Sequence, residues 1–302
     1  MDAAEAMGMT LEEIVEGHYL PDKRARRRTN TVEGYESSLR LHVLPRFGGL
    51  TVSQVERDEV QSWVDAFDLP GAAAKAYKCL RQVIRWAVRR WAMLVIDPTV
   101  GIELPRKPVH RFETLSAKQL AKRLRGMWGH PLEATCIVAS ALGLRPGEAY
   151  ALEWADIDWR SGKVVVSKTL QQVRGGVELY ATKTPKGDRE LYLARWALDR
   201  LRAIHRGAGS PAGRIVGGLT PSQVAGRIRR FVRRAGLPEV SMQGLRHTWG
   251  TLAVEAGIPI ETIAMQLGHA DVDVAYSHYM RRTKTIMQSA QRRWTKYLFS
   301  FA

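Results

Sequence analysis

Two prolines that stand three residues apart, in the segment Leu104-Pro105-Arg106-Lys107-Pro108, separate two parts of the chain with different hydropathy patterns. Proline fixes its backbone and lacks an amide donor, so helices and central strands do not continue through such a segment. Before it, residues from about 10 to 104 read as helical. After it, short runs of β-branched residues stand between helical segments. We therefore predict two domains, over residues 1–107 and 108–302.

The clearest element of the first part is a helix predicted over residues 72–91. Apolar residues recur at the spacing of one helix face, at Leu80, Val83, Ile84, Ala87, Val88 and Trp91. The opposite sector carries four cations, Lys78, Arg81, Arg85 and Arg89. A solvated surface is the ordinary explanation of such a row, but no acids are interleaved here, and a second basic run contains Arg26, Arg27 and Arg28. Contact with a duplex backbone is the better interpretation.

The net charge supports this interpretation. The 302 residues include 46 lysines and arginines against 30 aspartates and glutamates, a formal net charge of +16. This excess predicts a polyanionic partner, nucleic acid before an anionic membrane surface. No apolar run approaches the roughly 18 residues of a membrane span, and no secretory signal opens the chain. The two cysteines, Cys79 and Cys136, are typical of a reducing cytosol, so we predict a cytoplasmic protein with both cysteines buried.

The second part is predicted to be mainly α with a small antiparallel β-sheet. Helices are expected over 115–125 and 132–142, and strands over 164–166, 177–181 and 191–193. Thr220 and Pro221 predict the start of another helix, which continues to Ala235. The tail from residue 285 is too apolar for a free end. We expect it to dock, either on a neighbouring subunit or on its own.

Four segments of the second part could carry chemistry. They hold Arg145 after Leu142-Gly143-Leu144, Lys183 between two threonines, Arg246 after Gly244-Leu245, and His269 after Leu267-Gly268, with Tyr276 and Tyr279 beyond. Two arginines can stabilise the extra charge of a pentacoordinate phosphorus. A lysine can protonate a leaving oxygen, and a tyrosine hydroxyl can attack phosphorus. Spacing alone does not establish this, because an arginine after Leu-Gly-Leu is as often a surface residue.

The order of these segments and their amino-acid sequences resemble those of the phage integrase family of tyrosine recombinases, from about residue 25 to residue 290. The matching segments are Leu142-Gly143-Leu144-Arg145-Pro146-Gly147-Glu148, Thr182-Lys183-Thr184 with Arg189, Gly244-Leu245-Arg246-His247-Thr248, and Leu267-Gly268-His269. The first part resembles the helical core-binding domain of the family, and the second its catalytic domain with a C-terminal docking tail. Few families share this signature.

The resemblance implies a site-specific recombinase that cleaves and rejoins duplex DNA through a 3′-phosphotyrosine, for integration or excision of a mobile element. The implied catalytic residues are Arg145, Lys183, Gln243, Arg246, His269 and Tyr279. Tyr279 would attack the phosphate, and Lys183 would protonate the leaving 5′-oxygen. No metal and no nucleotide cofactor is implied. The expected partners are double-stranded DNA and, on two DNA sites, three further copies of the chain, which together form a homotetramer. Whether DNA-bending accessory proteins also take part is left open.

Two departures from the family pattern matter. Gln243 stands where the family commonly has histidine, and an amide cannot take up a proton near neutral pH. The usual position of the nucleophile, nine residues after His269, is His278. We prefer Tyr279 over Tyr276, because a histidine precedes the tyrosine in a longer variant of the segment, and we interpret Tyr276 as a core residue.

Other classes of protein are disfavoured. The histidines lack the spacing or the cysteine partners of a zinc site, and no phosphate-binding loop for ATP is present. Two alternatives stay open: a type IB topoisomerase-like activity, and a catalytically impaired DNA-binding protein of the same fold.

Overall fold

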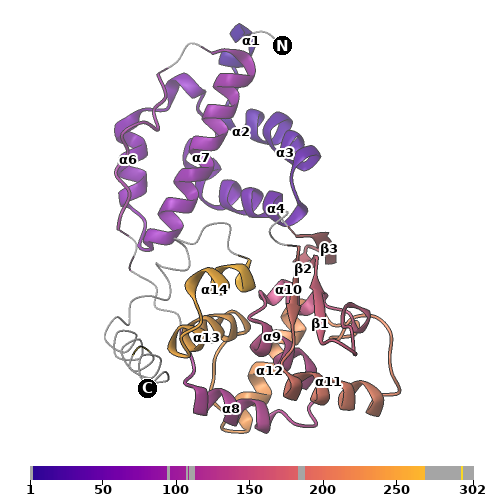
Figure 1. The fold of residues 1–302 in the computed structure, drawn as a ribbon. Helices are drawn as coiled ribbons and strands as arrows, with labels where there is room; N and C mark the ends of the chain where they lie inside the picture. Colours follow the sequence, from indigo (N-terminus) through magenta and orange to yellow (C-terminus); the bar gives the residue numbers. More distant parts are fainter. Residues whose placement is uncertain are drawn as a thin grey trace. The chain divides into compact units, whose positions relative to one another are not determined.

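The computed structural model describes residues 3–93, 96–106, 108, 113–182, 188–268 and 294 (Figure 1). Contacts between Cα atoms divide the chain into two compact units, Met1–His110 and Arg111–Ala302. Cys79 and Cys136 are both buried, one in each unit. In the described part of the chain, no helix is both long enough and apolar enough to cross a membrane.

The first unit is helical throughout its regular structure. Its elements are α1 (Ala3–Met7), α2 (Leu11–Ile14), η1 (Val15–Tyr19), α3 (Leu20–Arg26), α4 (Thr29–Ser38), η2 (Leu39–Val43), α5 (Leu44–Phe47), η3 (Val52–Gln54), α6 (Arg57–Asp65) and α7 (Pro70–Trp91). The longest, α7, runs through the middle of the unit (Figure 1). Its predicted apolar face is buried: Leu80, Ile84 and Ala87 are fully enclosed, whereas Val88 is only half-buried.

The prediction of helix up to residue 104 was wrong at its end. Helix α7 stops at Trp91, because Ala92 adopts a left-handed conformation with φ 50°. The described residues from 96 to 106 form turns and irregular structure instead. Pro70 is the first residue of α7, where its missing amide hydrogen costs no helical hydrogen bond.

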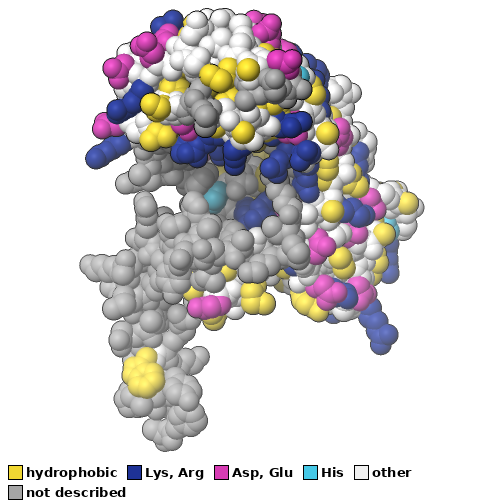
Figure 2. Space-filling model, turned by 90° about the horizontal axis from the view of Figure 1, so that it is seen from above, with side chains coloured by type: hydrophobic (Ala, Val, Ile, Leu, Met, Phe, Trp, Pro, Cys, Tyr) yellow, Lys and Arg dark blue, Asp and Glu magenta, His cyan; other side chains and the backbone are white. Residues whose placement is uncertain are grey.

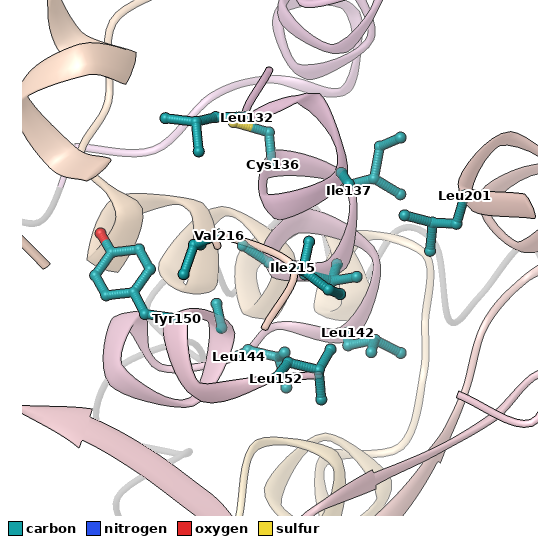
Figure 3. Packing of buried hydrophobic residues seen from close by; sticks show 14 of the residues in the cluster. Leu132, Cys136, Ile137, Leu142, Leu144, Tyr150, Leu152, Leu201, Ile215 and Val216 are labelled. Atoms are coloured by element: carbon teal, nitrogen blue, oxygen red, sulfur yellow. The ribbon is translucent and has the colours of Figure 1, made fainter. Parts of the chain in front are cut away.

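The second unit has seven α-helices and one short 3-10 helix among its described residues, together with four short strands. The elements are α8 (Ala117–Gly126), α9 (Glu133–Leu142), α10 (Pro146–Ala151), η4 (Trp154–Asp156), β1 (Lys163–Val166), β2 (Lys168–Val173), β3 (Gly176–Ala181), β4 (Arg189–Tyr192), α11 (Arg195–Gly207), α12 (Pro221–Arg234), α13 (Met242–Glu255) and α14 (Ile260–Leu267). Helix α9 is buried on nearly every side. Ile137 and Leu142 of α9 pack in one cluster with Leu201 of α11 and Ile215 (Figure 3).

The strands form two antiparallel pairs. Strand β1 pairs with β4, with Val164 opposite Leu191, and β2 pairs with β3, with Leu170 opposite Leu179. Strand β2 was not predicted, because only Leu170 in it is buried and the other side chains give no apolar alternation. The predicted start of α12 is confirmed: Thr220 accepts from the amide of Gln223 in a capping box. The fold is therefore mainly α with small antiparallel β-structure, as the sequence predicted.

Candidate active site and basic surface

Arg145 is fixed at the N-terminus of α10. It occupies the N-cap position, Pro146 follows as the first helical residue, and Glu148 stands at the third. The amide of Arg145 donates to Oε2 of Glu148 at 2.8 Å, and its Nη1 donates to Oε1 at 2.9 Å. The side chain of Arg145 remains 43% exposed, whereas that of Glu148 is 3% exposed. The guanidinium is therefore anchored through Nη1 and remains partly accessible to solvent.

Arg246 lies on α13 and is only 2% exposed. Its Nη1 donates to the carbonyl of Gly143 at 3.0 Å, and its Nη2 to the carbonyl of Leu267 at 2.6 Å. Gly143 ends α9 with φ +64°, and a Cβ at this residue would lie 2.8 Å from the Leu267 side chain. Gly143 belongs to the segment Leu142–Glu148, which we call the first-arginine segment, and is thus needed both for its backbone conformation and for its close packing against Leu267 and Trp249.

Three arginines from distant parts of the chain converge on the C-terminal end of α14. Arg189 Nε donates to the carbonyl of Gln266 at 2.9 Å, and Arg145 Nη2 to that of Gly268 at 3.0 Å. Together with the bond from Arg246 to Leu267, three consecutive carbonyls each accept from a different guanidinium. A helix C-terminus carries partial negative charge and unpaired carbonyls, which explains why cations gather there. The arginine pair predicted from the sequence therefore binds the carbonyls of the two residues that precede His269.

A buried carboxylate joins two of these arginines. Nη1 and Nη2 of Arg189 donate to Oε1 and Oε2 of Glu148, at 3.1 and 2.9 Å. Burial favours a raised pKa for Glu148, but the hydrogen bonds and charge of Arg189, with a smaller contribution from Arg145, outweigh it and leave the pKa lowered. Glu148 is therefore ionised, and the three arginines and one carboxylate keep a net positive charge. Such a cluster attracts an anion.

Glu148 and Arg189 lie within the segments that match the family, but neither was predicted as a site residue. The signal for Glu148 was its place three residues after Arg145 and two after Pro146, where a carboxylate caps a helix start. For Arg189 the sequence offers only a charge at the start of a strand. Its partners lie 41 and 77 residues away, so its role depends on the tertiary fold.

Gln243 stands one turn before His247 on α13. Its amide nitrogen lies 3.2 Å from Nε2 of His247. An amide nitrogen only donates, so in this contact the imidazole nitrogen accepts. The carbonyl oxygen of Gln243 is left to accept from another donor, such as a hydroxyl. His247 itself is 7% exposed, and its ring nitrogen lies against the amide of Gln243.

Several predicted site residues lie outside the described residues. They are Lys183, His269, Tyr276 and Tyr279, and the tail from residue 285, apart from Trp294, is outside as well. Their proposed roles stay predictions. In the described part of the chain, no group of three or more His, Cys, Asp or Glu side chains could hold a metal ion.

The first unit carries a concave surface that we call the basic hollow, with a volume of about 380 Å³. Its lining residues are Tyr19, Lys23, Arg27, Tyr35, Lys78, Arg81, Gln82, Arg85, Trp86 and Arg89. The whole cation row predicted on α7 lines it, together with Arg27 of the second basic run. In the space-filling view, Lys and Arg side chains gather in a row with few acids between them (Figure 2).

The cations of the basic hollow differ in their partners. Arg85 pairs with Asp97 at 3.0 Å, and Lys23 pairs with Asp22 at 2.8 Å. Lys78, Arg81 and Arg89 have no carboxylate partner among the residues that the structure describes, and Nε of Arg81 is buried without a hydrogen bond. These three charges are therefore available to an anionic ligand. Outside the hollow, Arg26 pairs with Asp22, and Arg28 is the N-cap residue of α4.

Comparison with known proteins agrees with this geometry. The model of the phage integrase family matches residues 113–285, and that of the phage integrase N-terminal SAM-like domain matches residues 10–67. A tyrosine recombinase XerC-like protein of Caldanaerobacter subterraneus subsp. tengcongensis is 24% identical, over 92% of this chain and 81% of the relative. A putative prophage phiRv2 integrase of Mycobacterium tuberculosis is also 24% identical, over 90% and 75%.

Two solved structures have a similar fold. The integrase of transposon Tn1549, in complex with transposon right end DNA, superposes with a TM-score of 0.78 at 17% identity, over 95% of this chain and 100% of the other. A lambda integrase dimer bound to a COC′ core site superposes with a TM-score of 0.70 at 17% identity, over 91% and 97%. By its sequence match and its fold, this chain belongs to the phage integrase family of tyrosine-type site-specific recombinases.

Proposed function

We propose that this protein cleaves and rejoins duplex DNA at specific sites through a 3′-phosphotyrosine intermediate, in the integration or excision of a mobile element. The observation that carries the proposal is the convergence of Arg145 and Arg246 on the consecutive carbonyls of Gly268 and Leu267. Two guanidinium groups at one point, with a net positive charge around them, suit a phosphate that gains charge during reaction.

The proposed reaction is a transesterification. The hydroxyl oxygen of Tyr279 attacks phosphorus, the bond from phosphorus to the 5′-oxygen breaks, and Lys183 gives that oxygen a proton. Arg145, Arg246 and His269 stabilise the charge on the phosphate oxygens. The tyrosine proton passes to solvent, because Gln243 can accept a hydrogen bond from the hydroxyl but cannot bind the proton. A 5′-hydroxyl of the partner duplex then attacks the phosphotyrosine and releases the tyrosine.

The basic hollow of the first unit is proposed to hold the DNA backbone. Lys78, Arg81 and Arg89 supply unpaired charge, and Arg85 can exchange Asp97 for a phosphate oxygen. Related integrases have been solved on DNA, including a lambda integrase tetramer bound to a Holliday junction. We extend both features to this chain as proposals: double-stranded DNA as substrate, and a homotetramer on two paired sites. The participation of DNA-bending accessory proteins stays a prediction.

The test is the formation of a covalent complex. The duplex carries a site that the protein selects from a random-sequence library, with a nick that lets the short cleaved strand escape. We expect wild-type protein to give a band that resists denaturation, and Tyr279→Phe to abolish it while binding DNA normally. Tyr276→Phe is the matched control and should keep the band. Absence of the band in wild-type protein refutes the proposal.

One observation favours a second candidate, a DNA-binding protein of this fold with impaired catalysis. Gln243 occupies the position where the family pattern has histidine, and an amide cannot take up the proton of the tyrosine. The same experiment separates the two functions, since an impaired protein binds the selected site but forms no covalent band.

A further inference from the structure

Arg189 contacts several of the segments that carry the proposed chemistry. It is the first residue of β4, on the C-terminal side of the segment that contains Lys183. Through Glu148 it is joined to the first-arginine segment, and through the carbonyl of Gln266 to the end of α14. The side chain is 7% exposed, so these contacts and not solvent satisfy its donors.

The charge of Glu148 is shared between two cations. Both Arg145 and Arg189 donate to its Oε1, at 2.9 and 3.1 Å. Without Arg189, the described structure leaves Arg145 as the one cation on this buried carboxylate. The whole negative charge would then act on the guanidinium that is proposed to bind the phosphate. Arg189 therefore keeps part of the charge of Arg145 available to a ligand.

The turn that leads to His269 packs directly against Arg189. Gly268 has φ +63°, and a Cβ at this residue would lie 3.2 Å from Nη1 of Arg189 and 3.4 Å from its Cδ. Arg189 thus packs against Gly268 and also binds the carbonyl of Gln266, two residues earlier. A shorter or uncharged side chain would leave both the turn and that carbonyl without support.

We propose that Arg189 is a positioning residue for strand cleavage, which holds Glu148 and the end of α14 so that Arg145 and His269 meet the same phosphate. The inference rests on the proposed function and deepens it. Arg189 itself does not touch the DNA. Its substitution should therefore slow cleavage without weakening DNA binding.

The experiment compares single-turnover cleavage of the nicked duplex with equilibrium binding of the same duplex. Arg189→Gln is expected to lower the cleavage rate by about 10²-fold, the usual effect of losing one electrostatic contribution to the transition state. Its dissociation constant should stay within about twofold. Arg189→Lys keeps the charge but cannot reach three acceptors with one ammonium, so an intermediate rate is expected.

The matched control is Arg200→Gln. Arg200 also forms a bidentate pair with a buried carboxylate, Glu133, at 2.5 and 2.9 Å, but on α11 and away from the arginine cluster. This variant should lose stability and keep the wild-type cleavage rate. The double variant Arg189→Gln with Glu148→Gln should cleave no more slowly than the slower single variant, because the two residues act as one unit.

Three results would overturn the inference. If Arg189→Gln cleaves at the wild-type rate, Arg189 is not a positioning residue. If the cleavage rate falls in proportion to thermal stability, and does so equally in the Arg189 and Arg200 variants, the role of Arg189 is only structural. Multiplicative losses in the double variant show independent action. If wild-type protein forms no covalent complex at all, the proposed function fails, and the inference fails with it.

Discussion

Replacing Glu148 by glutamine tests the buried charge at the centre of the site. The carboxylate accepts four hydrogen bonds, from the amide and Nη1 of Arg145 and from Nη1 and Nη2 of Arg189. A glutamine can accept with one oxygen only, and its NH₂ group would face two donors. Two charge-assisted bonds are lost and two like charges are left facing each other. We expect a loss of about 3–5 kcal/mol in the free energy of unfolding.

The assay is urea unfolding at several pH values, with Glu133→Gln as control. Glu133 is equally buried, but its partner Arg200 is 34% exposed and can regain water, so a smaller loss of about 1–3 kcal/mol is expected. The folded-state pKa of Glu148 is lowered from its usual value of 4.5. Its stabilisation is therefore complete above about pH 4.5 and is lost as the pH falls through the lower folded-state pKa.

The difference between wild-type protein and Glu148→Gln should accordingly be constant near neutral pH and should shrink below pH 4.5. A loss under 1 kcal/mol at pH 7, or a difference that grows in acid, would refute the reasoning that this carboxylate is ionised and held by both arginines.

Three further predictions concern other parts of the molecule. Gly147→Ala would place a Cβ against Oγ1 of Thr169 and 3.0 Å from the backbone carbonyl of Leu170. Thermal unfolding should therefore show a loss of about 1–3 kcal/mol, which adding Thr169→Ala restores only in part; a neutral effect would contradict the packing of β2 on α10. Arg81→Gln should lower the slope of log binding constant against log salt by about 1, measured by fluorescence anisotropy, whereas exposed Arg206→Gln should not change it. Gln243→His should speed strand cleavage by about 10-fold or more and add a dependence on pH near 6.5, since an imidazole can take the tyrosine proton; an unchanged rate would mean that proton removal does not limit cleavage.

Local patterns predicted much of the secondary structure. The apolar spacing on α7 placed four cations on one face, and the capping sequence at Thr220 located the start of α12. Strand β2 escaped prediction, since its side chains are mostly polar and its place is fixed by pairing with β3 and by packing on α10. Residues 96–106 do not continue the helix, because the left-handed backbone of Ala92 ends it.

The sequence by itself determined which residues could carry the chemistry, because arginine, lysine and tyrosine have the charge and reactivity that a phosphate requires, and because their order matches a known family. Only the tertiary structure decided how the arginines are held. Arg145, Arg189 and Arg246 are far apart along the chain, and their meeting at the end of α14 depends on how β4 and three helices pack. Hydrogen bonds between such distant residues leave no local pattern, so Glu148 and Arg189 became visible as a pair only in the folded protein.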